Sequence, residues 1–157
     1  MSFSIPKTPE VKMKIKEAEN SGVVIFVAAS NNNVNPGQSF SATLDTVLCI
    51  HATDGKGNKG SMNPEPESHR DNNSVLGVTV PSAWDNGVYL SGPSSATPVA
   101  AGMTAVALGF IKATVPASKM PTGSIEESFD RQGMKNIQLA MNMLRDGYNC
   151  IVPWCEF

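Results

Sequence analysis

The sequence has no excess of charge of either sign. Its 157 residues include 12 lysines and arginines against 14 aspartates and glutamates, which gives a net charge of -2. Such a balance offers no electrostatic attraction for phosphate backbones or anionic lipids, so no nucleic-acid partner is expected. Because 41% of the residues are hydrophobic and only 17% are charged, the composition excludes disorder and predicts a single domain over residues 1–157.

Long hydrophobic runs and export signals are lacking as well. The longest apolar runs, such as residues 23–29, are far shorter than the roughly 20 residues of a membrane helix, so no membrane contact is expected. The first seven residues have neither the basic start nor the apolar core of a secretory signal. These absences predict a soluble protein that is intracellular and cytoplasmic.

Cysteine is scarce, and metal-binding patterns are missing. The three cysteines are Cys49, Cys150 and Cys155. They cannot all pair within one chain and lack metal-ligand spacing, which predicts free buried thiols in a reducing compartment. Asp54 and Glu65 have the end-to-end spacing of a calcium loop, but Lys56 and Lys59 occupy positions that need a ligand and a glycine. We therefore expect no metal and no cofactor.

The elements that the sequence does show are those of a parallel α/β fold. Residues 8–21 predict a helix, because Thr8 can cap its first turn, Pro9 suits the first helical position and Gly22 follows its end. The run 23–29 is apolar and rich in β-branched residues without polar alternation, the pattern of a strand buried on both faces of a sheet. Further strands are predicted at 47–53, 75–80 and 88–90.

Two helical regions are predicted after these strands. Residues 94–115 are alanine-rich and apolar on nearly all sides, which indicates a helix that runs buried through the core. A capping-box pattern at 124–127 and helical spacing of apolar residues from Ile137 to Leu144 predict one or two surface helices near the C-terminus.

Ser94 stands where a tight Gly92-Pro93 turn enters the buried helix. The first backbone N–H groups of a helix have no intrahelical partner and carry partial positive charge, so negative charge developing beside Ser94 would be stabilised. A serine at such a position is also a common N-cap, which is the alternative interpretation.

This segment resembles the Gly-Thr-Ser-x-Ala-Thr-Pro nucleophile motif of the subtilases, the subtilisin-like serine peptidases. Gly92, Ser94, Ala96, Thr97 and Pro98 match it. Residues 24–31 are similar to the family's buried strand that ends in Ala-Ala-Gly-Asn. Shorter stretches look like subtilases of fungal intracellular type, at 40–42 with 47–57, 74–77 with 81–84, and 145–148 with 153–154. The resemblance covers the chain from about residue 10 to the C-terminus.

The resemblance implies an α/β fold, the C-terminal half of a subtilisin-like parallel-sheet domain with a central buried nucleophile helix. It further implies serine-type endopeptidase chemistry on a polypeptide substrate, with Ser94 as nucleophile and with the Asn31 side chain and the Ser94 N–H as oxyanion donors. Ala28, Ala29 and Ser30 would line the wall of the primary specificity pocket, where Ser30 replaces the usual glycine and narrows the floor. The alternative for Asn31 is a loop-capping asparagine.

The chain also departs from the family pattern. A subtilase triad runs in the order Asp, His, Ser, yet no histidine and no aspartate precedes Asn31. His51 lies in a predicted buried strand and is interpreted as a hydrogen-bonded core histidine, whereas His69 lies in a polar loop and is predicted to be solvated. No histidine follows Ser94, which excludes an α/β-hydrolase. Pro93 replaces the motif's threonine and removes its hydroxyl.

These departures leave three interpretations open. The chain belongs with serine endopeptidases but is expected to be inactive when isolated, since losing the base costs about a million-fold in such a site. Alternatively, it is a non-catalytic peptide-binding or regulatory pseudopeptidase, or a truncated product. The family also places strands upstream of residues 23–29, so we expect an open sheet edge that invites self-association or a complementing chain.

Overall fold

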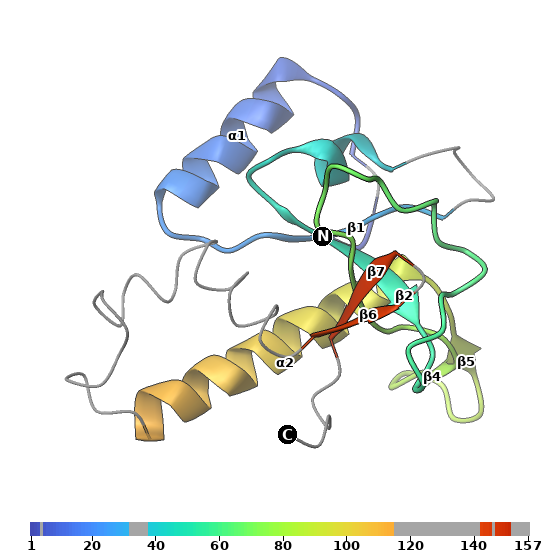
Figure 1. Cartoon of the computed structure of the whole chain (residues 1–157). Helices are drawn as coiled ribbons and strands as arrows, with labels where there is room; N and C mark the ends of the chain where they lie inside the picture. The colour runs from blue at the N-terminus through green and yellow to red at the C-terminus, as the bar shows by residue number, and fades with distance from the viewer. Residues whose placement is uncertain (4, 32–37, 115–141, 146, 152–157) are drawn as a thin grey trace.

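A five-stranded sheet in the order β1-β2-β3-β7-β6 organises the fold (Figure 1). The computed structural model describes residues 1–3, 5–31, 38–114, 142–145 and 147–151, and every structural statement below concerns these residues. Strands β1, β2, β3 and β7 pair in parallel, and β6 pairs antiparallel with β7. The strands are β1 (Phe26–Ala28), β2 (Leu48–Thr53), β3 (Asn73–Leu76), β6 (Asn142–Arg145) and β7 (Tyr148–Ile151). The α/β class and the parallel sheet predicted from the sequence are confirmed.

Helix α1 (Pro9–Asn20) forms where the sequence predicts it, for the expected local reasons. The Thr8 hydroxyl accepts a hydrogen bond from the Val11 N–H at 3.3 Å, and Pro9 occupies the first helical position. Gly22 follows the last turn with a φ of +78°, a left-handed conformation that glycine adopts without a Cβ penalty. Ile15 is the helix's buried residue and fixes the face that packs.

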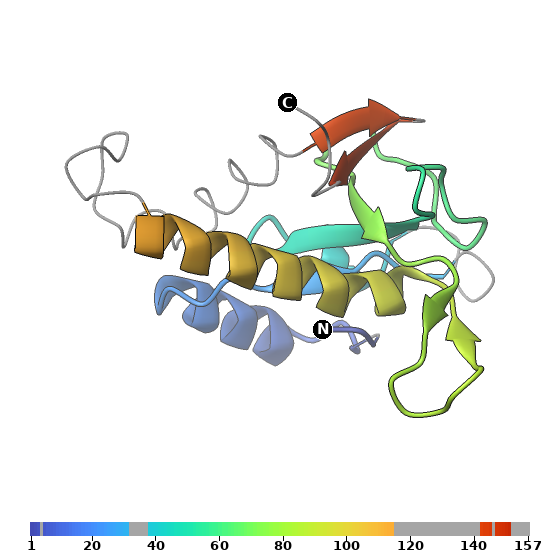
Figure 2. The same ribbon diagram turned by 90° about the horizontal axis from the view of Figure 1, so that it is seen from below.

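The strands are shorter than the apolar runs that predict them. Of the run 23–29 only Phe26–Ala28 forms β1, because Val23 is 52% exposed and lies before the point where pairing with β2 begins. All six residues of β2 are buried. The predicted strand at 75–80 is divided, since β3 ends at Leu76 and β4 (Val80–Pro81) pairs with β5 (Tyr89–Leu90) in a separate hairpin. Figure 2 shows this hairpin projecting beside the start of α2.

Helices cover both faces of the sheet, with α1 at the top of Figure 1 and α2 (Pro93–Thr114) below the strands. The cluster on the α1 side includes a short 3-10 helix, η1 (Phe40–Thr43), and its buried residues are Ile15, Val27, Ala29, Ala42, Val47 and Cys49. The cluster on the α2 side comprises Ile50, Ala52, Val75, Ala96 and Ala100. Alternate residues of β2 therefore serve opposite layers, as the period of a strand requires.

Only the first half of α2 is buried, so the prediction of a helix buried along its whole length is wrong. Ala96 and Ala100 pack against the sheet, whereas Val106 is 74% exposed and Phe110 is 67% exposed. The physical reason is length. A helix of 22 residues extends about 33 Å, while a strand of six residues reaches only about 20 Å, so the helix extends beyond the end of the sheet.

No helix in the described part of the chain is long and apolar enough to cross a bilayer.

The prediction that helical structure extends to Leu144 is also wrong, because residues 142–145 form β6. This strand pairs with β7, and β7 pairs with β3 about 75 positions earlier in the sequence. Such non-local pairing overrides the local helical spacing of the apolar residues. The predicted capping box at 124–127 and the rest of 115–141 lie outside the described residues.

The outer edge of β1 is partly covered, which corrects the expectation of a wholly open edge. The Ala28 N–H donates a hydrogen bond to the Met1 carbonyl at 3.0 Å, and the Met1 amino group donates to the Phe26 carbonyl. The Ser39 hydroxyl donates to the Ala28 carbonyl at 3.2 Å. Three of the backbone groups on this edge thus have partners within the chain.

Candidate active site

The turn that carries Ser94 is fixed to the sheet by its own backbone. The Gly92 N–H donates to the Gly77 carbonyl, directly after β3, at 2.7 Å. The Gly92 carbonyl in turn accepts from the N–H groups of Ser95 and Ala96, at 3.0 and 3.1 Å. Gly92 is therefore the N-cap of α2 and Ser94 is its second residue, so the alternative interpretation of Ser94 as the N-cap is wrong.

Substitution of Gly92 by any other residue is disfavoured. Its φ of +135° lies in the region that side chains disfavour, and Pro93 follows as the first residue of the helix. A β-carbon added at Gly92 would stand 3.1 Å from Asn31 Oδ1 and 3.7 Å from Met62 Cε. The backbone before Ser94 thus passes directly against the Asn31 side chain.

Asn31 reaches this turn from the other side of the site. It lies three residues after β1, is half-buried, and makes no hydrogen bond through its side chain among the described residues. Oδ1 faces Gly92, and Nδ2 has no hydrogen-bond acceptor among the residues that the structure describes. The structure therefore places Asn31 against the turn at Gly92, two residues before Ser94.

The start of α2 supplies further positive potential at Ser94. As the second helical residue, Ser94 has a backbone N–H with no intrahelical acceptor, and no bond of the described residues engages it. The aligned dipoles of a 22-residue helix place partial positive charge at the same end. The half-buried Ser94 hydroxyl thus lies where an anion would be stabilised.

The three predicted pocket residues differ in accessibility. Ala29 is fully buried in the core cluster on the α1 side, so its methyl group cannot touch a ligand. Ala28 and Ser30 are half-buried. Ser30 adopts a φ of +146°, which strains any residue that has a Cβ. Glycine adopts such a φ without this strain, which explains why the family motif has glycine at this position. Their role in a specificity pocket stays a prediction.

Neither histidine bonds to Ser94 in the described structure. His51 is fully buried in β2, with Nδ1 3.3 Å from the Asn73 carbonyl oxygen and its ring centroid 5.0 Å from that of Tyr148. Burial lowers the pKa of His51 to about 4, although the Asn73 contact opposes this shift. His69 is exposed in the loop before β3. Both histidines lie in the settings that the sequence predicts.

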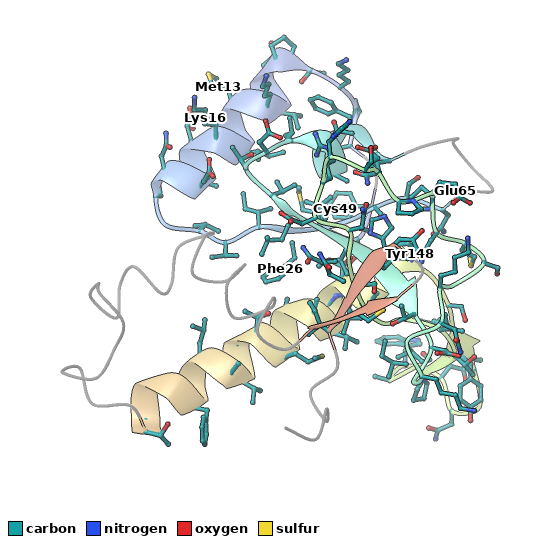
Figure 3. The ribbon with its side chains drawn as sticks, in the orientation of Figure 1. Met13, Lys16, Phe26, Cys49, Glu65 and Tyr148 are labelled. Carbon is teal, nitrogen blue, oxygen red and sulfur yellow. The ribbon has the colours of Figure 1, made fainter. Side chains whose placement is uncertain are left out.

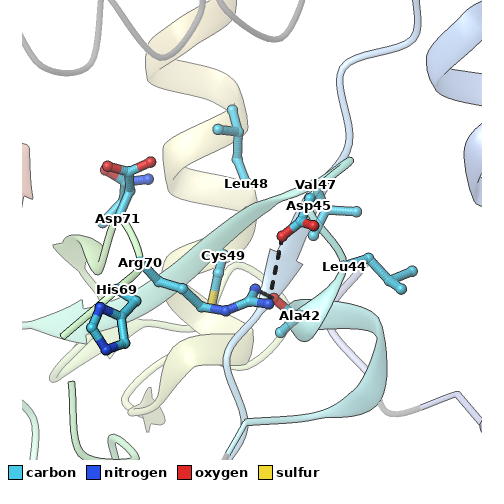
Figure 4. A pocket seen from close by; sticks show the side chains of 10 residues that line it. Ala42, Leu44, Asp45, Val47, Leu48, Cys49, His69, Arg70 and Asp71 are labelled. Carbon is cyan, nitrogen blue, oxygen red and sulfur yellow. Dashed lines mark hydrogen bonds and ion pairs between the residues drawn. The ribbon is translucent and has the colours of Figure 1, made fainter. Parts of the chain in front are cut away.

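A cavity of about 100 Å³ lies elsewhere, beside η1 and the start of β2 (Figure 4). Arg70 crosses it, with ion pairs to Asp45 at 3.6 Å and to Glu67 at 3.1 Å. Cys49 lines it as a free thiol whose pKa burial raises to about 12, which makes it unreactive. Cys49 (Figure 3) packs in the cluster on the α1 side, and neither Asn31 nor Ser94 lines this cavity.

A second hollow, of about 340 Å³, lies between the edge strand β1 and the first turns of α2. It is lined mainly by apolar residues from 1–2, 23–26 and 97–101. Among the described residues no group of three or more His, Cys, Asp or Glu side chains is placed to hold a metal ion.

The sequence matches no protein-family model and no curated protein. Solved structures are similar in fold. The prenylagaramide maturation protease PagA is 19% identical over 95% of this chain and 54% of its own, with a TM-score of 0.67. The PatG macrocyclase in complex with peptide is 20% identical over 92% and 42%, with a TM-score of 0.66. The patellamide maturation protease PatA is 19% identical over 90% and 48%, with a TM-score of 0.68.

These likenesses establish the fold and no more. The chain spans about half the length of the solved structures it matches. Its parallel sheet with flanking helices is that of the subtilisin-like protease domains, as the sequence motifs predict. The narrower resemblance to fungal intracellular subtilases is not supported, because the similar structures are maturation proteases and a macrocyclase.

Proposed function

We propose that this chain carries the nucleophile and the oxyanion donors of a serine endopeptidase site. Ser94 is the nucleophile, and the Asn31 side chain with the Ser94 N–H holds the oxyanion. The observation that carries the proposal is the contact of Asn31 with the Gly92 turn, where Oδ1 lies 3.1 Å from the position of a Gly92 β-carbon. The subtilisin-like fold supports it, since this turn begins the long helix α2.

In the proposed reaction Ser94 Oγ attacks the carbonyl carbon of a peptide bond, and the carbonyl oxygen gains negative charge. Nδ2 of Asn31 and the N–H of Ser94 would donate to that oxygen, aided by the partial positive charge at the start of α2. Loss of one such donor costs about 10²- to 10³-fold in rate. Ala28, Ala29 and Ser30 directly precede Asn31. Their backbone would form one wall of the pocket that holds a side chain of the peptide.

The attack also needs a proton acceptor for the Ser94 hydroxyl. In the described residues no imidazole is bonded to Ser94, and His51 is held within β2 by Asn73 and Tyr148. We therefore propose that the chain on its own hydrolyses peptides very slowly. The same observation favours a second candidate function, a module that binds peptide beside Asn31 and Ser94 without cleaving it.

Labelling with a fluorophosphonate probe tests the nucleophile. We expect slow labelling of the wild-type chain that Ser94→Ala abolishes and that Asn31→Ala slows by about 10²-fold or more. Ser95→Ala is the matched control, because Ser95 is half-buried in the same helical turn and has no proposed role. Its labelling should equal that of the wild type.

Three outcomes would contradict the proposal. Labelling as fast as that of an intact serine peptidase would show that a base does serve Ser94. Absence of labelling, together with shifts of the Gly92 amide resonance on adding an unstructured peptide, would instead favour the peptide-binding module. Equal labelling of the wild type and Ser94→Ala would exclude Ser94 as the nucleophile.

A further inference from the structure

The β4–β5 hairpin, which projects from the sheet in Figure 2, turns at an Asn-Gly pair. The Val88 N–H donates to the Asp85 carbonyl at 3.3 Å, which closes a turn with Asn86 and Gly87 at its centre. Gly87 has a φ of +89°, which glycine adopts without a Cβ penalty. Asn86 is the only asparagine of the sequence that a glycine follows. The turn therefore places a side-chain amide next to a backbone nitrogen that no neighbouring side chain shields.

The two central residues of this turn are open to solvent. All residues from 83 to 90 are exposed, and Trp84 near the pair is 98% exposed. The Gly87 N–H donates no hydrogen bond among the described residues, and a β-carbon added at Gly87 would have no atom within 4 Å. The Gly87 nitrogen is thus unengaged in the described structure, and the amide carbon of the Asn86 side chain can close a succinimide ring on it.

We propose that Asn86 is a site of spontaneous deamidation, which converts it to aspartate or isoaspartate. The Gly87 nitrogen attacks Cγ of Asn86, a C–N bond forms, and the side-chain nitrogen leaves as ammonia with the proton of the Gly87 N–H. Water then opens the succinimide at either of its carbonyl carbons. Opening at Cγ gives aspartate, and opening at the backbone carbonyl gives isoaspartate. Water is the only co-reactant, and nothing is oxidised or reduced.

Isoaspartate would weaken the hairpin, because it lengthens the backbone of the turn by a methylene group. The turn fixes the register of a hairpin, and this ladder has only the pairs Val80 with Leu90 and Pro81 with Tyr89. Pro81 has no N–H to donate, so little else holds the two strands together. Strand β5 leads directly into Ser91, whose Oγ accepts from the Thr79 N–H at 2.9 Å. The change therefore reaches the segment that enters α2.

Two other asparagines precede a small residue, and the structure protects both. Asn20 is exposed at the end of α1, but the Ser21 N–H donates to two carbonyls in the last turn of that helix, at 3.1 Å each. Asn73 and Ser74 are buried in β3. Asn20 is therefore the matched control for Asn86, since it is equally open to water but the nitrogen that follows it is engaged.

Incubation of the full-length chain at mildly alkaline pH tests the modification. Ion-exchange chromatography follows the gain of a negative charge, peptide mass spectrometry locates it, and methylation by an isoaspartyl methyltransferase identifies isoaspartate. We expect the wild type and Asn20→Gln to accumulate the acidic form at the same rate, and Asn86→Gln to accumulate it at least several-fold more slowly. An aged wild type that stays unmodified at Asn86, or an equal rate in Asn86→Gln, would overturn the proposal.

Amide hydrogen exchange tests the effect on the hairpin. The Ser82 N–H donates to the Val88 carbonyl at 2.8 Å across the two arms, so its exchange reports whether they stay paired. We expect faster exchange at Ser82 in the isoaspartyl chain and wild-type exchange in Asn86→Asp, which carries the new charge on an unaltered backbone. Equal exchange in the isoaspartyl chain and the wild type would show that the hairpin does not open. Neither readout depends on the reactivity of Ser94, so the inference is tested separately from the proposed function.

Discussion

Acidification is expected to destabilise the fold through His51. The imidazole is fully buried, and Nε2 has no hydrogen-bond partner among the described residues. Burial lowers the pKa of His51 from 6.5 to about 4, and the contact of Nδ1 with the Asn73 carbonyl offsets only part of that effect. The neutral ring is therefore the form that the folded state accommodates, between Asn73 and Tyr148.

The direction and size of the effect follow from the two pKa values. The unfolded chain binds a proton at His51 below pH 6.5, whereas the folded chain binds it only near pH 4. The unfolded state thus holds more protons within this window, and the free energy of unfolding falls as the pH falls through it. At about 1.4 kcal/mol per pKa unit the full loss below pH 4 is about 3 kcal/mol, of which about 2 kcal/mol is lost by pH 5.

Urea unfolding followed by circular dichroism at pH 8 and pH 5 measures this loss. His51→Phe removes the titrating group while keeping a flat ring, so its stability should depend much less on pH than that of the wild type, whatever its absolute value. His69→Gln is the matched control, because His69 is the only other histidine of the sequence and is exposed. An unchanged pH dependence in His51→Phe, or its disappearance in His69→Gln, would refute the reasoning.

Three further perturbations test the packing. Gly77→Ala should cost about 1–3 kcal/mol in urea unfolding, because the new β-carbon would stand 2.6 Å from a side chain of α2, whereas Gly102→Ala, with nothing within 4 Å, should stabilise by about 1 kcal/mol. Ser30→Gly should raise stability by about 1 kcal/mol by relieving the φ of +146°, and a lower urea midpoint would contradict this. We expect light scattering to show concentration-dependent association that Val23→Lys weakens, because Val23 lines the hollow beside β1. Met13→Lys is the control and should not weaken it, since Met13 and Val23 are similarly exposed, at 53% and 52%. A wild-type chain that stays monomeric at all concentrations would exclude this association.

The elements that the sequence predicts well are those fixed by neighbouring residues. Helix α1 is bounded by the Thr8 cap and by Gly22, and α2 begins one residue before the predicted start, at Pro93. Strand β2 follows directly from its continuous apolar run. The association of Asn31 with the Ser94 turn was predicted only through a family resemblance, because no local pattern joins residues about 60 positions apart.

The features that the sequence does not predict depend on contacts between distant segments. Leu144 shows helical spacing with its neighbours, yet pairing with β7 places it in a strand. The loop at 60–63 shows no strand pattern, yet the Asn63 side chain pairs with the backbone of Ala52 in β2. Asparagine side chains that imitate a strand leave no signal in hydropathy, so such an anchor is visible only in three dimensions.

The candidate site forms at the carboxyl edge of the parallel sheet, where α/β folds commonly bind ligands. Asn31 follows the end of β1, and the turn before Ser94 is tied by Gly77 to the end of β3. His51 is instead within β2, between two residues that face α2, so its ring points to the opposite face. An imidazole in that position cannot take the Ser94 proton without breaking the sheet. Any base that activates Ser94 must therefore approach from the carboxyl edge and not through the sheet.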